Sequence, residues 1–223
     1  MNIKLFLQAI IKFLLGVLII GILLFIPAGT IEYWNACLLM GLLFIPMFIV
    51  GIILMIKNPD LLKKRLNAKE KEKSQKKVIT LSGVMYILGF VIAGLNYRYN
   101  WIELPNIVII IASITFILSY ILYGEILREN TYLSRTIEVQ ENQKVIDTGL
   151  YRIVRHPMYA TTILLFLSIP LILGSIISFF VFLFYPIIIA KRIKNEEEVL
   201  EKKLEGYKEY KNKVKYKIIP FIW

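Results

Sequence analysis

Long apolar runs, uncharged except for Lys12 in the first, alternate with charged segments along this chain. Six runs are expected to form helices, at residues 5–27, 34–56, 78–95, 105–123, 159–173 and 176–190. The first four hold roughly 18–23 residues each, enough to cross about 30 Å of hydrocarbon at 1.5 Å per residue. The pattern therefore predicts an all-α, polytopic integral membrane helical bundle of about six spans.

The last two runs are shorter, at roughly 15–17 residues, and only Gly174-Ser175 separates them. They are expected to form a short helical hairpin with kinks at Pro170 and Pro186, because proline removes a helical hydrogen bond. We divide the chain into N-terminal membrane helices (1–124) and a second region (125–223) that contains the hairpin, the loop before it and the C-terminal tail.

Composition supports a membrane protein. Apolar residues make up 57% of the 223 residues, against about 45–50% in an ordinary soluble domain. Apart from Lys12, the charged residues lie outside the apolar runs, and the net charge is +11. Basic residues crowd 57–77, 125–157 and the tail after 190, whereas 28–33 and 96–104 hold only Arg98. By the positive-inside rule, both termini and both long loops are expected in the cytoplasm, in contact with membrane lipids, and nucleic-acid binding is not expected.

The two long loops differ in pattern. Residues 67–77 are polar and lysine-rich, which predicts a solvated connector near lipid headgroups. Residues 136–140 alternate polar and apolar side chains, and 143–146 follow a possible turn at Glu141-Asn142. This pattern predicts two short strands.

The chain has few residues of the types that form disulfides or bind transition metals. Cys37 is the single cysteine and His156 the single histidine of the chain, so neither a disulfide within the chain nor a multi-histidine or cysteine metal site is possible. We expect no metal.

Two polar clusters are candidates for chemistry. The first is Arg155-His156-Pro157-Met158-Tyr159, where proline suits a helix start whose free N–H groups favour an anionic ligand; the alternative is an interfacial anchor. The second holds Arg192, Glu196 and Glu197. If the last helix continues past 190, Arg192 and Glu196 share one face, as a substrate site or as a solvated ion pair. The tail beyond 204 has regularly spaced aromatic residues and predicts an amphipathic cover over the bundle.

Taken together, these motifs resemble the isoprenylcysteine carboxyl methyltransferase family and its relatives among phospholipid methyltransferases. The resemblance runs from about Thr136 to the C-terminus. It rests on Gly149-Leu150-Tyr151, Arg155-His156-Pro157-Met158-Tyr159, Arg192, Glu196-Glu197, Leu200, Gly206, Tyr207, Tyr210 and Pro220. One departure is that Gly206 and Tyr207 are adjacent, whereas the family often separates this glycine and tyrosine.

The resemblance implies an S-adenosylmethionine-dependent methyltransferase acting on a lipidic or prenylated acceptor, a small molecule or a peptide. The acceptor group would be a carboxylate, with a phospholipid amine as the alternative. Arg192, Glu196 and Glu197 would be catalytic, with Arg192 facing the substrate. The cofactor would contact Gln143, Lys144, Val145, Ile146, Tyr151, His156, Pro157, Met158, Tyr159 and Glu196.

Two other functions compete with this one. Steroid-reductase-like membrane enzymes, which use NADPH, also carry a His-Pro-x-Tyr element near a C-terminal hairpin, but the Arg192-x-x-x-Glu196-Glu197 spacing favours the methyltransferase. A non-catalytic membrane scaffold would bind neither cofactor.

Overall fold

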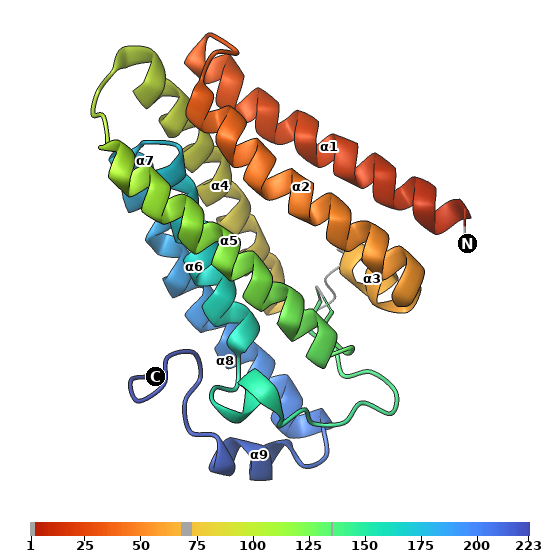
Figure 1. The fold of residues 1–223 in the computed structure, drawn as a ribbon. Helices are drawn as coiled ribbons and strands as arrows, with labels where there is room; N and C mark the ends of the chain where they lie inside the picture. Colours follow the sequence, from red (N-terminus) through yellow and green to blue (C-terminus); the bar gives the residue numbers. More distant parts are fainter. Residues whose placement is uncertain (1–2, 68–72, 135) are drawn as a thin grey trace.

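The computed structural model describes residues 3–67, 73–134 and 136–223, and these residues form helices and irregular segments without a β-strand. Figure 1 shows the arrangement. The helices are α1 (Ile3–Ala28), α2 (Trp34–Lys57), α3 (Pro59–Leu66), α4 (Lys73–Tyr99), α5 (Asn106–Glu129), α6 (Pro157–Ile172), α7 (Ile176–Phe182), α8 (Phe184–Lys203) and α9 (Tyr207–Lys213), with a 3₁₀ turn η1 (Gly149–Arg152).

The fold is a polytopic membrane helical bundle, as the apolar pattern predicts. Helices α1, α2, α4 and α5 and the α7–α8 segment are long and apolar enough to span a bilayer, whereas α6 is a shorter apolar helix of 16 residues. Large apolar side chains such as Ile11, Ile52 and Ile110 are exposed on the outside. A compact core that includes Phe116 and Phe182 joins the helices.

The chain places its connections at two ends of the bundle. The α1–α2, α4–α5 and α6–α7 connections lie at one end, and α3, the segment between α5 and α6, and α9 lie at the other (Figure 1). This is the alternation expected for a chain that crosses back and forth. The charged loops of the sequence therefore share one end.

The α6–α7 turn is fixed to the rest of the bundle. Gly174 has a φ of 72°, a left-handed conformation that glycine adopts without steric cost. Ser175 caps α7 by accepting a hydrogen bond from the backbone N–H of Ser178. The Ser178 hydroxyl donates to the Gly89 carbonyl of α4 at 2.8 Å, and the Tyr33 hydroxyl at the start of α2 donates to the Leu173 carbonyl at 2.5 Å. The hairpin is thus held against α2 and α4.

The second arm of the hairpin is longer than expected. Helix α7 ends at Phe182, four residues before Pro186, because a proline cannot donate to the carbonyl four residues back and crowds it. Helix α8 then continues to Lys203 instead of ending near 190. Arg192, Glu196 and Glu197 therefore lie on one continuous helix.

The sequence interpretation was wrong for parts of two loops. Residues 59–66 form α3 and Lys73 already begins α4, so 67–77 is not a connector throughout; its residues 68–72 lie outside the described residues. The expected strands at 136–140 and 143–146 do not form. The Gln140 backbone N–H instead donates to the Gln143 side-chain oxygen at 2.9 Å, and the Gln140 amide donates to the Tyr132 carbonyl at 2.6 Å. Side-chain bonds thus take the place of a strand ladder around the turn at Glu141-Asn142.

Candidate functional site

A cavity opens at the loop-bearing end of the bundle. Its walls come from the segment between α5 and α6, the start of α6, the second half of α8 and α9. It is lined by Asn130, Tyr132, Leu133, Ser134, Thr136, Ile137, Glu138, Gln143, Lys144, Val145, Ile146, Tyr151, Arg155, His156, Met158, Tyr159, Arg192, Glu196, Leu200, Leu204, Tyr207 and Tyr210. Every one of these residues follows 124, the end of the expected N-terminal region.

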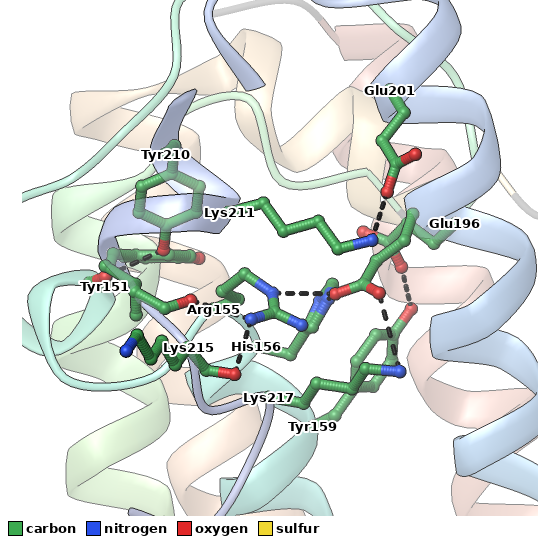
Figure 2. A network of polar contacts seen from close by, with 12 residues as sticks. Tyr151, Arg155, His156, Tyr159, Glu196, Glu201, Tyr210, Lys211, Lys215 and Lys217 are labelled. Atoms are coloured by element: carbon green, nitrogen blue, oxygen red, sulfur yellow. Dashed lines mark hydrogen bonds and ion pairs between the residues drawn. The ribbon is translucent and has the colours of Figure 1, made fainter. Parts of the chain in front are cut away.

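Tyr159 joins the two charged residues of α8 that face the cavity. The Arg192 Nε donates to the Tyr159 hydroxyl at 2.9 Å. The hydroxyl in turn donates to a carboxylate oxygen of Glu196 at 2.5 Å, as Figure 2 shows for Tyr159 and Glu196. Positions four apart share a helix face, so α8 presents a cation and an anion to the same cavity, with one hydroxyl between them.

Glu197 faces away from this pair and contacts Arg155 instead. We call the group formed by Glu197, Arg155 and the carbonyls of Val214 and Lys215 the clamp. The Arg155 Nε donates to Glu197 at 2.8 Å, and both side chains are nearly buried, at 4% and 6% exposure. The Arg155 guanidinium also donates to the Val214 carbonyl at 2.7 Å and to the Lys215 carbonyl at 2.8 Å. Figure 2 labels Arg155 and Lys215. The clamp therefore fastens the C-terminal tail to α8 and to the segment before α6.

His156 belongs to both the cavity wall and the clamp region. It lines the cavity, and its Nε2 lies 3.1 Å from the Glu197 carboxylate. Backbone bonds extend the contact, because the N–H groups of Arg155 and His156 donate to the carbonyls of Tyr216 and Lys217 at 2.9 and 2.8 Å. The tail thus runs alongside 155–156, immediately before α6 begins at Pro157.

Tail helix α9 closes the cavity with aromatic side chains. The Tyr210 hydroxyl donates to the Tyr151 carbonyl at 2.7 Å, and the Tyr151 hydroxyl accepts from Asn130 at 3.0 Å. Burial raises the pKa of both phenols, so they remain neutral at physiological pH. The expectation that the tail covers the bundle agrees with this packing.

Steric constraints explain why position 149 is a glycine. Its φ is +47°, and a Cβ at this position would lie 2.2 Å from a Glu129 carboxylate oxygen. The same carboxylate accepts from the Thr148 hydroxyl at 2.8 Å and from the Leu150 N–H at 3.3 Å. The glycine therefore allows the end of α5 to anchor η1, which carries Tyr151 into the cavity wall.

The structure brings most of the predicted site residues together. Of the expected cofactor contacts, all but Pro157 line the cavity, and so does Arg192, whereas Glu197 is absent from the lining. The cavity lining also includes residues that sequence reasoning did not assign to a site: Asn130, Tyr132, Leu133, Ser134, Thr136, Ile137, Glu138, Leu200, Leu204, Tyr207 and Tyr210. For Tyr207 and Tyr210, the aromatic spacing of the tail was the available signal.

One buried group of the cavity wall, a tyrosine hydroxyl, has no hydrogen-bond partner among the residues that the structure describes. Among the described residues, the Tyr207 hydroxyl is buried and makes no hydrogen bond. Burial, followed by the charges of Glu197 and Glu196, raises the pKa of this phenol, so it remains a donor at neutral pH. Buried polar groups are almost always paired, which makes this hydroxyl a candidate ligand contact.

The donor set suits S-adenosylmethionine in chemistry. The tyrosine rings can pack on a purine, the Glu196 carboxylate can face a positive centre, and the Tyr207 hydroxyl offers an unused hydrogen bond. The cavity measures about 100 Å³, below the roughly 300–1,000 Å³ of small-molecule sites. A ligand of that size would need more room than this volume gives, and the part of the lining between α5 and η1 is irregular in structure. No group of three or more His, Cys, Asp or Glu side chains able to hold a metal occurs among the described residues.

The fold and the site define a class: a membrane helical bundle with an aromatic, carboxylate-bearing cavity at one end. Comparison with known families agrees with that class, because residues 106–206 match the family model of phospholipid methyltransferases. The match covers α5 through the end of α8 and supports a membrane methyltransferase. It is equally consistent with a phospholipid acceptor and with the narrower isoprenylcysteine resemblance. No curated protein matches the chain.

Proposed function

We propose that this protein is an integral membrane S-adenosylmethionine-dependent methyltransferase that modifies a lipidic or isoprenylated acceptor. A carboxylate is the first candidate for the accepting group, and a phospholipid amine is the second. The end of the bundle that carries the cavity faces the cytoplasm, since the basic loops are at that end.

The observation that carries this proposal is the pair of Arg192 and Glu196, joined through Tyr159 in the wall of an aromatic cavity. The pair lies within the segment that matches the methyltransferase family model. A transfer reaction needs its two reactants held in contact. A cation and an anion on one helix face give each reactant its own electrostatic partner.

S-Adenosylmethionine, when bound, would supply a methyl group on a positively charged sulfur. The residues that would hold it are Gln143 to Ile146, Tyr151, His156, Met158, Tyr159 and Glu196, with Tyr207 added by the structure. Pro157, expected as a further contact, begins α6 and thereby positions its neighbours in the cavity wall.

Arg192 would orient the acceptor. A carboxylate is ionised at pH 7 and needs no base, so a guanidinium that fixes its direction is sufficient. An amine must lose a proton before it can react, and the Glu196 carboxylate is then a candidate base in the cavity wall. Glu197, expected among the catalytic residues, would act indirectly by holding Arg155 and the tail in place.

The test is calorimetric titration of the detergent-purified protein with S-adenosylhomocysteine, with NADPH titrated in parallel. We expect S-adenosylhomocysteine to bind and NADPH not to bind. S-Adenosylhomocysteine lacks the charged sulfur but keeps the α-ammonium group, which is the positive group that Glu196 would bind. Glu196→Gln should therefore weaken that binding by about 10- to 100-fold, the value of a charge-assisted bond of about 1.5–3 kcal/mol.

Glu198→Gln is the matched control, because Glu198 is on the same helix, is exposed and does not line this cavity. It should leave the affinity within about twofold. Binding of NADPH alone would identify a reductase, and equal effects of the two substitutions would remove Glu196 from the site.

A further inference from the structure

Helix α3 places a guanidinium beside the cavity from a part of the chain outside the family match. The Asn58 side chain caps α3 by accepting from the Leu61 N–H at 3.1 Å, and Pro59 occupies the first turn. Leu61 and Leu62 are buried. The apolar side of this short helix is thus anchored on the bundle, at the boundary where α2 ends.

Arg65, in the last turn of α3, reaches from there to the cavity wall. Its guanidinium contacts the Tyr123 hydroxyl and lies over the Tyr123 ring, 5.5 Å from the centroid. It also lies 3.5 Å from the Ser134 carbonyl and 4.0 Å from the Met158 sulfur. Ser134 and Met158 both line the cavity, so Arg65 contacts the cavity wall from outside the cavity.

The contacts that Arg65 makes with other described residues are with neutral groups: a phenol, a carbonyl and a thioether. None of the ion pairs formed within the described residues involves it. An oxyanion is the ligand that the planar fork of a guanidinium fits best.

Arg65 and Arg192 reach neighbouring residues at the start of α6. The Arg65 guanidinium lies 4.0 Å from the Met158 sulfur, and the Arg192 Nε donates to the Tyr159 hydroxyl at 2.9 Å. Met158 and Tyr159 both line the cavity, so the two arginines approach the same part of its wall, one from α3 and one from α8.

We propose that Arg65 is an acceptor-positioning residue that binds an anionic group, a phosphate or a carboxylate, of a membrane amphiphile. This inference rests on the proposed methyltransferase function and deepens it. The acceptor would carry a negative charge held by Arg65 at the membrane boundary, while its reactive group lies near Arg192.

The test measures binding of dioctanoyl phosphatidylglycerol to the detergent-purified protein by native mass spectrometry, with dioctanoylglycerol and inorganic phosphate as comparison ligands. We expect the phospholipid alone to bind well. Arg65→Gln should weaken its binding at least about tenfold, the effect of losing a charge-assisted hydrogen bond, and Arg65→Lys should restore part of it. S-Adenosylhomocysteine affinity should be unchanged in both variants.

Lys63→Gln is the matched control, since Lys63 is an exposed cation on the same helix. Equal losses in Lys63→Gln and Arg65→Gln would overturn the proposal, because a diffuse basic surface would then explain binding. Equal binding of dioctanoylglycerol, or binding of free phosphate that depends on Arg65 as strongly as the lipid does, would overturn it as well. If Arg65→Gln does not fold, Arg65→Lys decides. Weaker binding of the phospholipid than in the wild type, at normal S-adenosylhomocysteine affinity, supports the inference. Phospholipid binding equal to that of the wild type refutes it. Absence of S-adenosylhomocysteine binding in the wild type would instead contradict the proposed function itself.

Discussion

Two regions meet on α8, and they use adjacent glutamates in opposite ways. Glu196 faces the cavity, where its carboxylate accepts a hydrogen bond from Tyr159. Glu197 faces the clamp, where it is buried against Arg155 and lies 3.5 Å from the Lys217 ammonium. Successive residues of an α-helix differ by about 100° in direction, so two neighbouring glutamates face a cavity and a buried ion pair. The comparison teaches that the two glutamates should be tested separately, because their surroundings differ.

The largest effect that separates the two regions should come from Glu197→Gln. This substitution leaves the buried Arg155 guanidinium without its counter-charge, and breaking a buried ion pair costs about 3–5 kcal/mol. We expect a large fall in the midpoint of thermal unfolding in detergent, together with loss of the tail from the bundle. Tryptophan fluorescence can follow the transition in a Trp34→Phe/Trp101→Phe background, where Trp223 of the tail is the remaining tryptophan, and light scattering gives a second signal.

Glu201→Gln provides the control for this prediction. Glu201 pairs with Lys211, but both side chains are partly exposed, at 32% and 39%, and such pairs contribute about 0–1 kcal/mol. A small shift for Glu201→Gln and a large one for Glu197→Gln would sharpen the contrast. If Glu197→Gln has the same unfolding midpoint as the wild type and loses only cofactor binding, Glu197 acts in the cavity and not in the clamp.

Arg192→Ala should act on the cavity and spare the clamp. Its guanidinium contacts the Tyr159 hydroxyl on the cavity side, so we expect acceptor methylation to fall about 10- to 100-fold, as for loss of a charge-assisted bond, with S-adenosylhomocysteine affinity retained. Arg192→Lys should recover only part of the activity, because an ammonium cannot bind an oxyanion bidentately. Single-turnover methyl transfer to a lipid extract, with cofactor affinity measured separately, distinguishes the two effects. Loss of cofactor binding in Arg192→Ala would show that its role is not acceptor orientation.

Sequence reasoning found the cavity better than the clamp, for a physical reason. Arg192 and Glu196 are four residues apart, and helical periodicity alone places them on one face. The clamp joins Arg155 to Glu197 and to Val214 across 42 and 59 residues, and no local pattern encodes such a contact. The hydrophobic runs likewise located the membrane helices, because bilayer thickness fixes their length.

The misinterpreted loops show the limits of periodicity. Asn58-Pro59-Asp60 followed by a basic last turn is a complete set of helix signals, so α3 was accessible from the sequence, although the abundance of lysine nearby suggested a solvated connector. The alternation at 136–140 satisfied the strand pattern, but Gln140 and Gln143 bond the backbone locally. Polar side chains of this kind compete with strand pairing.

The smallest expected effect on stability, and the finest test of the cavity, is Tyr207→Phe. The substitution removes only a hydroxyl that has no partner among the described residues, and deleting an unpaired buried polar group costs nothing in hydrogen bonds. We therefore expect the unfolding midpoint to stay equal or rise slightly. Tyr210→Phe is the control, since its hydroxyl donates to the Tyr151 carbonyl at 2.7 Å and its removal should cost about 1 kcal/mol or more.

If the Tyr207 hydroxyl contacts the cofactor, S-adenosylhomocysteine affinity should fall about three- to tenfold in Tyr207→Phe, the value of one neutral hydrogen bond of about 0.5–1.5 kcal/mol. Unchanged affinity together with unchanged stability would show that this hydroxyl serves neither region, and the ligand contacts would then have to be sought along the opposite wall, between Asn130 and Ile146.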